Sequence, residues 1–328
     1  MATVTSPASP SLDTLVLHEP SLLPPEPPDD QFYHHRVRPI ESLKTLWGHR
    51  EIIHTLAERD FRAQYKQATL GILWAVISPV LTLCIMIVIF SRVKSFGSEG
   101  LPYALYAFVG ILCWSFFASS LSNGGQSLLN NKALLAKTQF PRECFPLENM
   151  CVSGINTVTS WIPLAILFVI FGRAPRLAGV FVPLLMIIEV VFAAGVTLAV
   201  AGLIIQMRDL VQVLPMITTL GLFATPVIWP YSKIPTDFHV AGGHVVRTIG
   251  KHGHAVHHLV GGFTINLQMV YGFFNPIGPV IDQARWTLLL GHTPEWNLVG
   301  VAALGAVLYL YFGYRIFKRL EVNFADIA

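Results

Sequence analysis

Residues 180–206 read VFVPLLMIIEVVFAAGVTLAVAGLIIQ, an apolar run in which Glu189 is the one charged side chain. A helix needs about 20 consecutive apolar residues to cross the hydrocarbon core of a bilayer. Similar runs recur along the chain, which is 53% hydrophobic and 12% charged. We therefore expect six membrane-spanning helices, at residues 71–91, 103–121, 150–171, 180–206, 210–229 and 297–317.

The composition excludes several classes of protein. A soluble domain of 328 residues would interleave charges through such runs to keep one helix face wet. The net charge of +3 is too small to indicate a nucleic-acid partner. Cys84, Cys113 and Cys151 lie in or beside the apolar runs, as buried thiols rather than a disulfide framework. The sequence predicts an all-α polytopic membrane protein.

The N-terminal residues differ in composition from the rest of the chain. Residues 1–30 are rich in Pro, Ser, Thr and Ala and lack both a basic start and an apolar core, so they do not resemble a cleaved signal peptide. We expect residues 1–35 to form a disordered cytoplasmic tail.

The distribution of basic residues predicts the orientation. Six spans place both termini on one side of the membrane, and short cytoplasmic loops carry an excess of Lys and Arg. Comparing short loops only, this excess favours cytoplasmic termini in a multi-pass protein of the plasma (inner) membrane. The residues then placed inside are Arg59, Arg62, Lys66, Lys132, Lys137, Arg142, Arg208, Arg315, Lys318 and Arg319.

An amphipathic helix is predicted before the first span, within residues 36–66. Trp47, Ile53, Leu56 and Phe61 recur at helical spacing, with charged residues mainly between them. Such a helix can lie in the membrane interface, or it can pack on the bundle as a small cytoplasmic helix. Because the first span follows within ten residues of Phe61, we favour the interface.

Residues 128–146, LLNNKALLAKTQFPRECFP, are too polar to cross a bilayer. An apolar stripe of Leu134, Leu135 and Phe140 predicts a short cytoplasmic helix that ends before Pro141. The alternative is an ordinary basic loop. The basic residues around the stripe are Lys132, Lys137 and Arg142.

A long outer region follows the fifth span. Residues 239–262 are rich in His and Gly, and without an HExxH motif and with only Asp237 as a nearby carboxylate we expect a solvated loop rather than a metal site. Residues 263–290 are apolar but interrupted by Asn275, Pro276 and Arg285. Non-helical backbone survives at membrane depth only against protein or water, so we predict two short re-entrant helices broken near Asn275 and Pro276.

Catalytic motifs are absent. The chain has neither a GxxxxGK[ST] phosphate loop nor a GxSxG elbow, so we predict no catalytic residue and no metal. Glu189, inside a span, indicates a polar pathway or an interhelical contact. Two other classes stay open. A membrane enzyme that modifies glycans would need an outer site from Asp237, Asp282 and the histidines, and a secondary transporter would show internal repeats, which we do not find.

Six stretches, in order, resemble the ABC-2 family of polysaccharide export permeases over about residues 50 to 328. They are RDFRAQYKQATLGILWAVISPVLTLCIMIVIF (59–90), FVGILCWSFF (108–117), NNKALLAKTQFPRECFP (130–146), RDLVQVLP (208–215), ATPVIWP (224–230) and RLEVNFADIA (319–328). The resemblance implies an ABC-2 type transmembrane domain over residues 67–328. Residues 239–262 depart from it as an insertion, which suggests a branch whose cargo is a cell-wall galactan.

The resemblance also implies a function. Members export O-antigen, teichoic acid or related lipid-linked glycans, and a separate ATP-binding cassette subunit binds ATP and Mg and supplies the energy. This chain would then be no enzyme and would hold no cofactor. Its gate helix would include Trp47, Arg59 and Arg62. Its coupling helix for the ATPase would include Lys132, Leu135, Lys137, Phe140 and Arg142.

Aromatic side chains on the first and fifth spans are candidates for the substrate path, since aromatic faces stack on sugar rings. The alternative is the ordinary aromatic belt at the membrane interface. Six helices seldom enclose a path wide enough for a glycan, so we expect a homodimer with the conduit at its two-fold axis. The candidates are Trp74, Phe90, Phe223, Trp229 and Tyr231.

Overall fold

The computed structural model describes most of the chain, and all described residues belong to one unit, Pro39–Ala328. The predicted tail at residues 1–35 lies outside the described residues. For Phe90, and for residues between 238 and 264, no side chain is described. The described ranges are 46–66, 69–90, 100–135, 141–236, 238–240, 244–249, 255–260 and 263–321.

Four helices are long and apolar enough to cross a membrane. Three of them are composite, because a π-helical stretch, a one-residue interruption or a 3₁₀ turn lies within their length. In chain order they are α4 (Tyr103–Ser119) with η3 (Ser120–Gly124) and α5 (Gly125–Asn130); α7 (Cys144–Thr159) with α8 (Trp161–Ile170); η4 (Leu177–Phe181) with α9 (Val182–Gln206); and α13 (Trp296–Glu321).

The other two predicted spans are shorter apolar helices, α3 (Leu73–Phe90) and α10 (Leu210–Ala224). Helix α10 ends five residues before the predicted end of the fifth span. Thr225 has extended backbone angles, φ −87° and ψ 145°, because the residue before a proline, here Pro226, avoids the helical region. The helical fold is therefore confirmed, and four of the six predicted spans are helices of spanning length.

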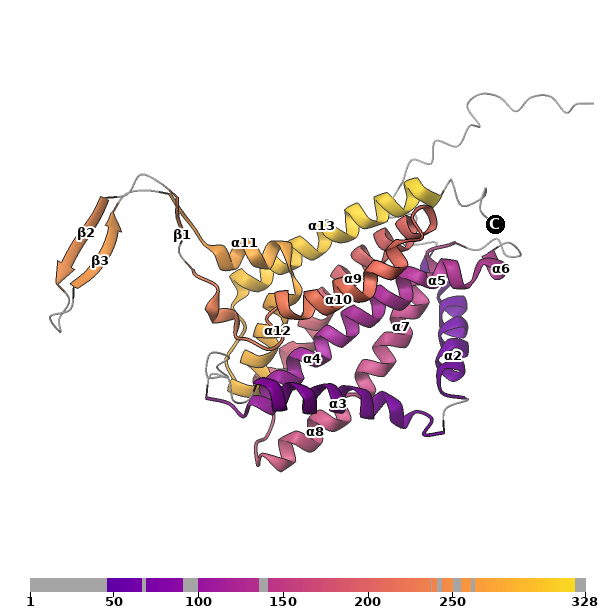
Figure 1. Ribbon diagram of the computed structural model, residues 1–328, viewed down its shortest axis with the longest axis horizontal. Coiled ribbons are helices and arrows are strands. Elements are labelled where there is room, and N and C mark those ends of the chain that lie inside the picture. Colours follow the sequence, from indigo (N-terminus) through magenta and orange to yellow (C-terminus); the bar gives the residue numbers. More distant parts are fainter. Residues whose placement is uncertain are drawn as a thin grey trace, which may run out of the picture. The chain divides into compact units, whose positions relative to one another are not determined.

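Helix α4 lies at the centre of the bundle, where most of its side chains are buried. Its residues Leu105, Phe108 and Ile111 join one hydrophobic core with side chains of α9 and α12. Figure 1 shows α4, α9 and α13 running alongside one another. Burial of this apolar surface organises the packing between the helices.

Helices α9 and α13 approach each other at backbone distance. A Cβ atom added to Gly313 would lie 1.9 Å from the carbonyl oxygen of Gly195, and one added to Gly195 would lie 2.4 Å from the backbone of Tyr309. Small residues allow such approach between membrane helices, where packing replaces the hydrophobic effect as a driving force.

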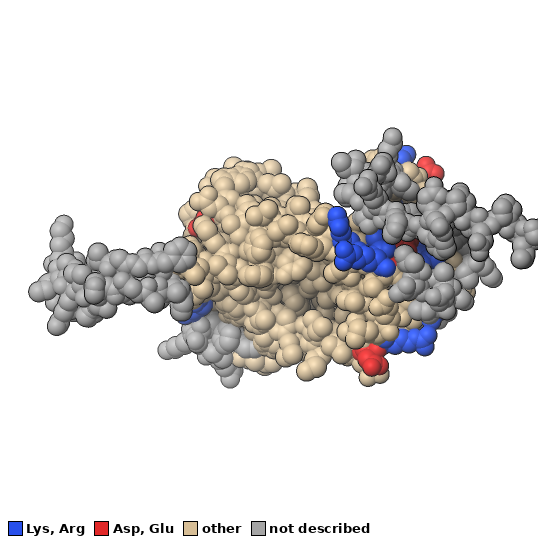
Figure 2. Space-filling model, turned by 90° about the horizontal axis from the view of Figure 1, so that it is seen from above, with Lys and Arg blue, Asp and Glu red and all other residues tan. Residues whose placement is uncertain are grey.

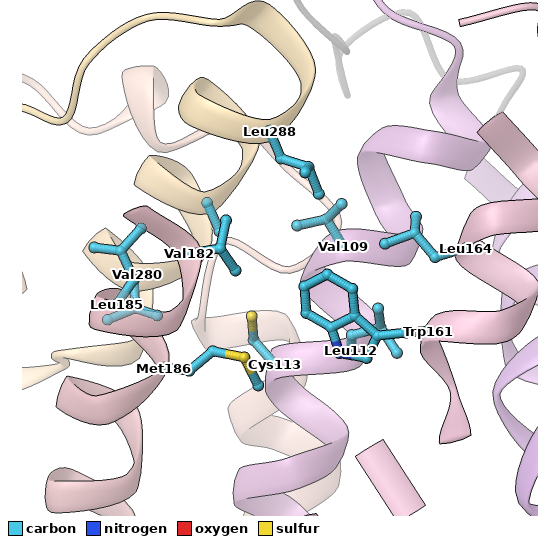
Figure 3. Close-up of a pocket in the computed structure, with 11 residues that line it drawn as sticks. Val109, Leu112, Cys113, Trp161, Leu164, Val182, Leu185, Met186, Val280 and Leu288 are labelled. Carbon is cyan, nitrogen blue, oxygen red and sulfur yellow. The ribbon is translucent and has the colours of Figure 1, made fainter. Parts of the chain in front are cut away.

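A buried cavity of about 20 Å³ lies between α4, α8, α9 and α12. Figure 3 shows Val109, Cys113, Trp161, Val182 and Leu288 around it, and most of the lining is apolar. A space of this size holds about one water molecule. It is too small to admit a sugar residue.

The two ends of the bundle differ. Helices α2 (Arg50–Lys66) and α6 (Lys132–Leu135) lie at one end in Figure 1, and α11 (Leu267–Phe274) and α12 (Ile277–Arg285) lie toward the other. The break between α11 and α12 falls at Asn275 and Pro276, as predicted. A π-helical stretch, η6 (Trp286–Leu290), continues α12.

The His/Gly-rich stretch contains strands, where the sequence led us to expect a loop. Strands β1 (Phe238–Val240) and β4 (Phe263–Ile265) pair antiparallel, and so do β2 (His244–Ile249) and β3 (Ala255–Val260). The β-branched residues between the glycines favour extended backbone. The abundance of His and Gly indicated a loop, and the β-branched residues between them were not considered.

Charged residues are unevenly distributed over the surface. On the face shown in Figure 2, Lys, Arg, Asp and Glu gather toward the two ends, and a broad band between them carries none. An uncharged band between two charged ends is what a bilayer requires of a spanning protein.

Candidate functional site

Three cationic side chains gather at the turn that joins α2 to α3. Arg59, Arg62 and Lys66 are spaced so that they share one face of α2, and they line an open pocket with Phe61 and Tyr65. The pocket continues to the connecting turn, which contains Gly71 and Ile72. Gly71 has a φ of +52°, a backbone conformation that favours glycine.

This basic pocket keeps a net positive charge. The Arg59 guanidinium pairs with Asp60 at 2.6 Å, and Arg62 pairs with Glu58 one helical turn away. The hydrogen bond to Asp60 raises the pKa of Arg59 further, so this side chain stays a cation. Lys66 has no ion-pair partner among the residues that the structure describes.

Hydrogen bonds attach α2 to two neighbouring elements. Arg59 Nη2 donates to Asn131 Oδ1 at 3.3 Å, directly before α6. The Tyr65 hydroxyl donates to Asn156 Oδ1 of α7 at 2.9 Å. The basic pocket is therefore connected both to the predicted coupling segment and to the third predicted span.

The predicted gate helix is described from residue 46 onward, and residues 36–45 lie outside the described residues. Leu56 and Ala57 are buried where α2 packs against α7. Trp47, in the turn before α2, is 72% exposed and its carbonyl oxygen accepts a hydrogen bond from Arg50. The middle of the apolar stripe packs on the bundle, and its first aromatic residue lies outside it.

The predicted coupling residues fall into two places. Lys132 and Leu135 are half-buried on the short helix α6. Arg142 instead donates to the carbonyl oxygen of Glu321 at 2.8 Å, at the end of α13. Lys137 and Phe140 lie outside the described residues.

A charged cluster that the sequence analysis missed lies beside Arg142. Lys318 pairs with the buried Glu143 and with Glu321 at 2.7 Å, and the Tyr314 hydroxyl donates to Glu143 at 3.2 Å. Tyr314 and Lys318 are one turn apart on α13, and Glu143 is directly before α7. The sequence pattern that could have indicated this cluster is the spacing of Tyr314 and Lys318, two polar residues one helical turn apart near the end of the last span.

The predicted aromatic path divides into exposed and buried residues. Trp74 and Phe223 are 43% and 49% exposed, so their rings lie on the outside of the bundle. Trp229 donates through Nε1 to the Phe223 carbonyl oxygen at 2.9 Å. Tyr231 is 2% exposed and donates to the Gln268 carbonyl oxygen at 2.5 Å, so its ring packs inside the protein. The Phe90 side chain is not among the described ones.

Arg285 of α12 is buried and holds three backbone carbonyl groups. It donates to the Tyr106 oxygen at 2.9 Å, to the Pro226 oxygen at 2.8 Å and to the Val227 oxygen. Its guanidinium also lies 3.7 Å from the centre of the Tyr106 ring. A Cβ atom added to Gly110 would lie 2.4 Å from this side chain, so α4 must carry a glycine there.

The end of α10 is fixed by a second set of bonds. Asn275 donates to Thr225 Oγ1 at 2.9 Å and to the Tyr271 hydroxyl at 2.8 Å. Burial raises the pKa of Tyr271 to about 12, so its hydroxyl stays protonated and donates to the Ala224 oxygen at 2.8 Å. The broken helices α11 and α12 thus fix residues 224–227.

Glu189 lies buried within α9, near Cys113. Neither of its carboxylate oxygens has a hydrogen-bond partner among the described residues. Its polar neighbour is the Cys113 thiol of α4, so Glu189 makes the interhelical contact that was one of the two predicted roles. The structure places this carboxyl inside the bundle rather than in the basic pocket.

A bundle of spanning helices, with a basic pocket at one end and broken, buried helices at the other, defines a multi-pass membrane protein. Residues 51–241, more than half of the chain, match the family described as ABC-2 type transporter. The chain belongs to this family, as the motifs predicted. Membership implies an ABC transporter with an ATP-binding partner.

Three proteins to which the chain is similar carry the name O-antigen export system permease protein RfbA. One, from Myxococcus xanthus, is 28% identical over 198 residues, which cover 60% of this chain and 75% of the relative. Two from Klebsiella pneumoniae are 25% and 28% identical over 279 residues, which cover 84% of this chain and 95% of each relative.

Proposed function

We propose that this chain is the membrane subunit of an ATP-driven exporter that moves a lipid-linked polysaccharide from the cytoplasm to the outer face of the inner membrane. The names of three relatives support an O-antigen-like cargo. The cell-wall galactan suggested by the sequence is the narrower version of this proposal, and its support is the insertion at residues 239–262 alone.

The observation that carries the proposal is the basic pocket at the turn between α2 and α3. A glycan carried on a lipid has phosphate groups between lipid and sugar, and guanidinium and ammonium groups bind phosphate through charge-assisted hydrogen bonds. Arg59, Arg62 and Lys66 supply three such groups in one open pocket. Trp47, exposed before α2, suits the lipid interface.

The link from Arg59 to Asn131 supports coupling to ATP hydrolysis. In this proposal the ATPase contacts α6, and a shift of α6 pulls on α2 through this bond. The phosphate-binding face of α2 would then move with each ATP cycle. The ATPase supplies ATP and Mg binding, and this chain supplies the path.

The conduit is proposed to lie between two copies of this chain. The buried cavity of about 20 Å³ cannot pass a sugar. Trp74 and Phe223 instead present their rings on the outside of the bundle, where a second copy would complete a passage. Two copies of the ATPase would complete the assembly, giving four chains in all.

We place the α2 and α6 end in the cytoplasm, with both termini on that side. Basic residues concentrate in the short connections at this end, as they do in cytoplasmic loops. A cysteine at Glu51 should react with an impermeant thiol reagent only after the membrane is opened, and one at His292 should react in intact cells. The reverse pattern would invert the orientation.

The export function is tested with a variant of the basic pocket, Arg62→Gln combined with Lys66→Gln. Surface polysaccharide should fall while lipid-linked glycan accumulates inside, because the phosphate group loses two of its cations. Arg50→Gln is the matched control, since Arg50 is an exposed cation on the same helix outside this pocket.

Co-purification with the ATP-binding subunit shows whether each variant assembles. Normal export by the assembled double variant would refute the role of the basic pocket. Deletion of the whole chain without any loss of surface polysaccharide would refute the export function itself.

A further inference from the structure

Three helices carry hydroxyl or amide side chains at helical spacing within the predicted spans. On α3, Trp74, Ser78 and Thr82 follow one another at intervals of four residues and share a face. The matching residues on α4 are Ser115 and Ser119, and those on α7 and at its C-terminal end are Ser153, Asn156, Thr157 and Ser160.

These side chains line a single groove of about 280 Å³. Gln64 and Tyr65 of α2 also line it, and Ala75, Pro79 and Leu112 complete the lining. Among the described residues, none that lines the groove is charged. Polar side chains inside a membrane are costly, and those that line a cavity rather than a closed interface mark a substrate path.

Two of the hydroxyl groups bond only within their own helices, so the set does not serve packing between helices alone. Thr82 donates to its own helix at Ser78 O (3.1 Å), and Thr157 donates to Ser153 O (2.9 Å). Hydroxyl contacts between helices include Ser119 with Ser153 at 3.0 Å and Ser160 to Ala75 O at 3.3 Å. The Thr82 and Thr157 hydroxyl groups donate their hydrogens and keep acceptor lone pairs, which can take a hydrogen bond from a ligand.

The groove adjoins the basic pocket. Tyr65 lines both, and its hydroxyl donates to Asn156 Oδ1 at 2.9 Å. The Asn156 amide nitrogen donates in turn to Gln64 Oε1 at 3.4 Å. A cationic pocket and a groove lined by hydroxyl groups therefore meet at Tyr65 of α2.

We propose that this groove binds neutral sugar residues at the lipid-phosphate end of the glycan, an inference that rests on the proposed function. Trp74 offers a flat aromatic face to the C–H side of a sugar ring. Ser78, Thr82 and Thr157 accept hydrogen bonds from sugar hydroxyls, and Asn156 both donates and accepts. The absence of charge in this lining selects neutral sugars over acidic ones.

Photo-crosslinking locates the glycan directly. A benzoylphenylalanine at Ser78, on the groove, should capture glycan during export in the native cells, detected as a glycan-stained adduct. The same group at Ile85, 57% exposed on the same helix and outside the groove lining, should not. Benzoylphenylalanine at a third position, Phe223, should capture glycan if the glycan passes through the proposed conduit between two copies.

The outcomes separate this inference from the proposed function. An adduct at residue 78 and not at 85 supports the groove. Adducts at 223 but not at 78, or normal export without an adduct at 78, overturn it. Equal adducts at 78 and 85 also overturn it, because they show unspecific contact. The export function is tested separately by deleting the whole chain. That deletion should abolish export whether or not the groove binds glycan.

A hydroxyl deletion gives a second test. Thr157→Val keeps the shape of the side chain and should lower the export rate at limiting glycan by roughly three- to tenfold, the worth of one hydrogen bond. Thr159→Val is the matched control, because Thr159 bonds its own helix at Ile155 O (3.0 Å) and lies outside the groove. A melting temperature that falls for Thr157→Val with no specific loss of export would assign the hydroxyl to packing and overturn the proposal.

Discussion

Arg285 shows how the bundle accommodates a buried charge without a carboxylate. Among the described residues no acid pairs with it, and three carbonyl oxygens and the Tyr106 ring surround it instead. Those carbonyls belong to α4 and to the turn after α10. The guanidinium fork suits this task because it presents several donors in one plane.

Replacing this side chain should therefore unfold the end of the bundle that holds α12. In Arg285→Met the three carbonyl groups lose their donor, at about 1–3 kcal/mol for each buried group left unsatisfied. We expect a large fall in the melting temperature and yield of the purified protein. Arg285→Lys should recover little, because one ammonium cannot reach three divergent oxygens.

The control is Arg315→Met, since Arg315 is exposed on α13 and lies over the Tyr311 ring at 5.1 Å. A melting temperature that drops equally in both variants would contradict the structural role of Arg285.

At this scale the sequence analysis identified residue types better than residue roles. Arg59 and Arg62, assigned by the resemblance to the gate helix, line one pocket that the sequence analysis did not predict. Arg285 was visible only as an interruption of an apolar run, because its partners lie 58 to 179 positions away. Tyr231 is buried by contacts with α11 that no local pattern displays.

Among the elements, α9 and α13 depend on the close approach of Gly195 and Gly313. Gly313→Ala should separate the two helices, because its Cβ atom would overlap the Gly195 carbonyl group, which is backbone and cannot rotate away. We expect a clear loss of thermal stability. Gly300→Ala, on the same helix with open space around it, should be neutral or slightly stabilising. Equal behaviour of the two variants would show that the helices do not meet there.

Helix α6 is the element on which coupling can be tested. Leu135→Asp should leave assembly with the ATPase intact and disconnect ATP hydrolysis from export, because it breaks the apolar stripe proposed to contact that subunit. ATPase activity and surface polysaccharide measured together distinguish this from misfolding. Arg173→Asp, an exposed charge change at the end of the third span, is the control. An assembled Leu135→Asp variant that exports normally would remove α6 from the coupling path.

Elements set by local chemistry were predictable, and those set by pairing were not. Proline marked the break between α11 and α12, as predicted, whereas the end of α10 at Ala224 lies five residues before the end predicted for the fifth span. Strands β2 and β3 need each other to form, and their residues are separated by glycines that suggested a loop. The polar residues of α3 and α7 recur in the sequence at intervals of three and four residues. They lie within apolar runs, which predicted spans and gave no sign of a groove.

For the whole molecule, the proposed homodimer makes a geometric prediction. Single cysteines at Trp74 or Phe223, in a chain otherwise free of cysteine, should crosslink two copies, because these exposed rings are proposed to face the two-fold axis. Val169, 80% exposed on α8, should not crosslink. Efficient crosslinking from Val169 with none from the other two positions would reverse the arrangement of the subunits.

The bonds between distant residues set an order for biosynthesis. Glu143 accepts a hydrogen bond from Tyr314, which lies 171 positions later in the chain. The Tyr106 carbonyl oxygen accepts one from Arg285, 179 positions later. A nascent chain that has inserted its first spans therefore carries a carboxylate and carbonyl groups whose partners are still untranslated. A ribosome stalled before Trp296 should leave a membrane-inserted intermediate that quality-control proteases degrade, and release of the last helix should end that vulnerability.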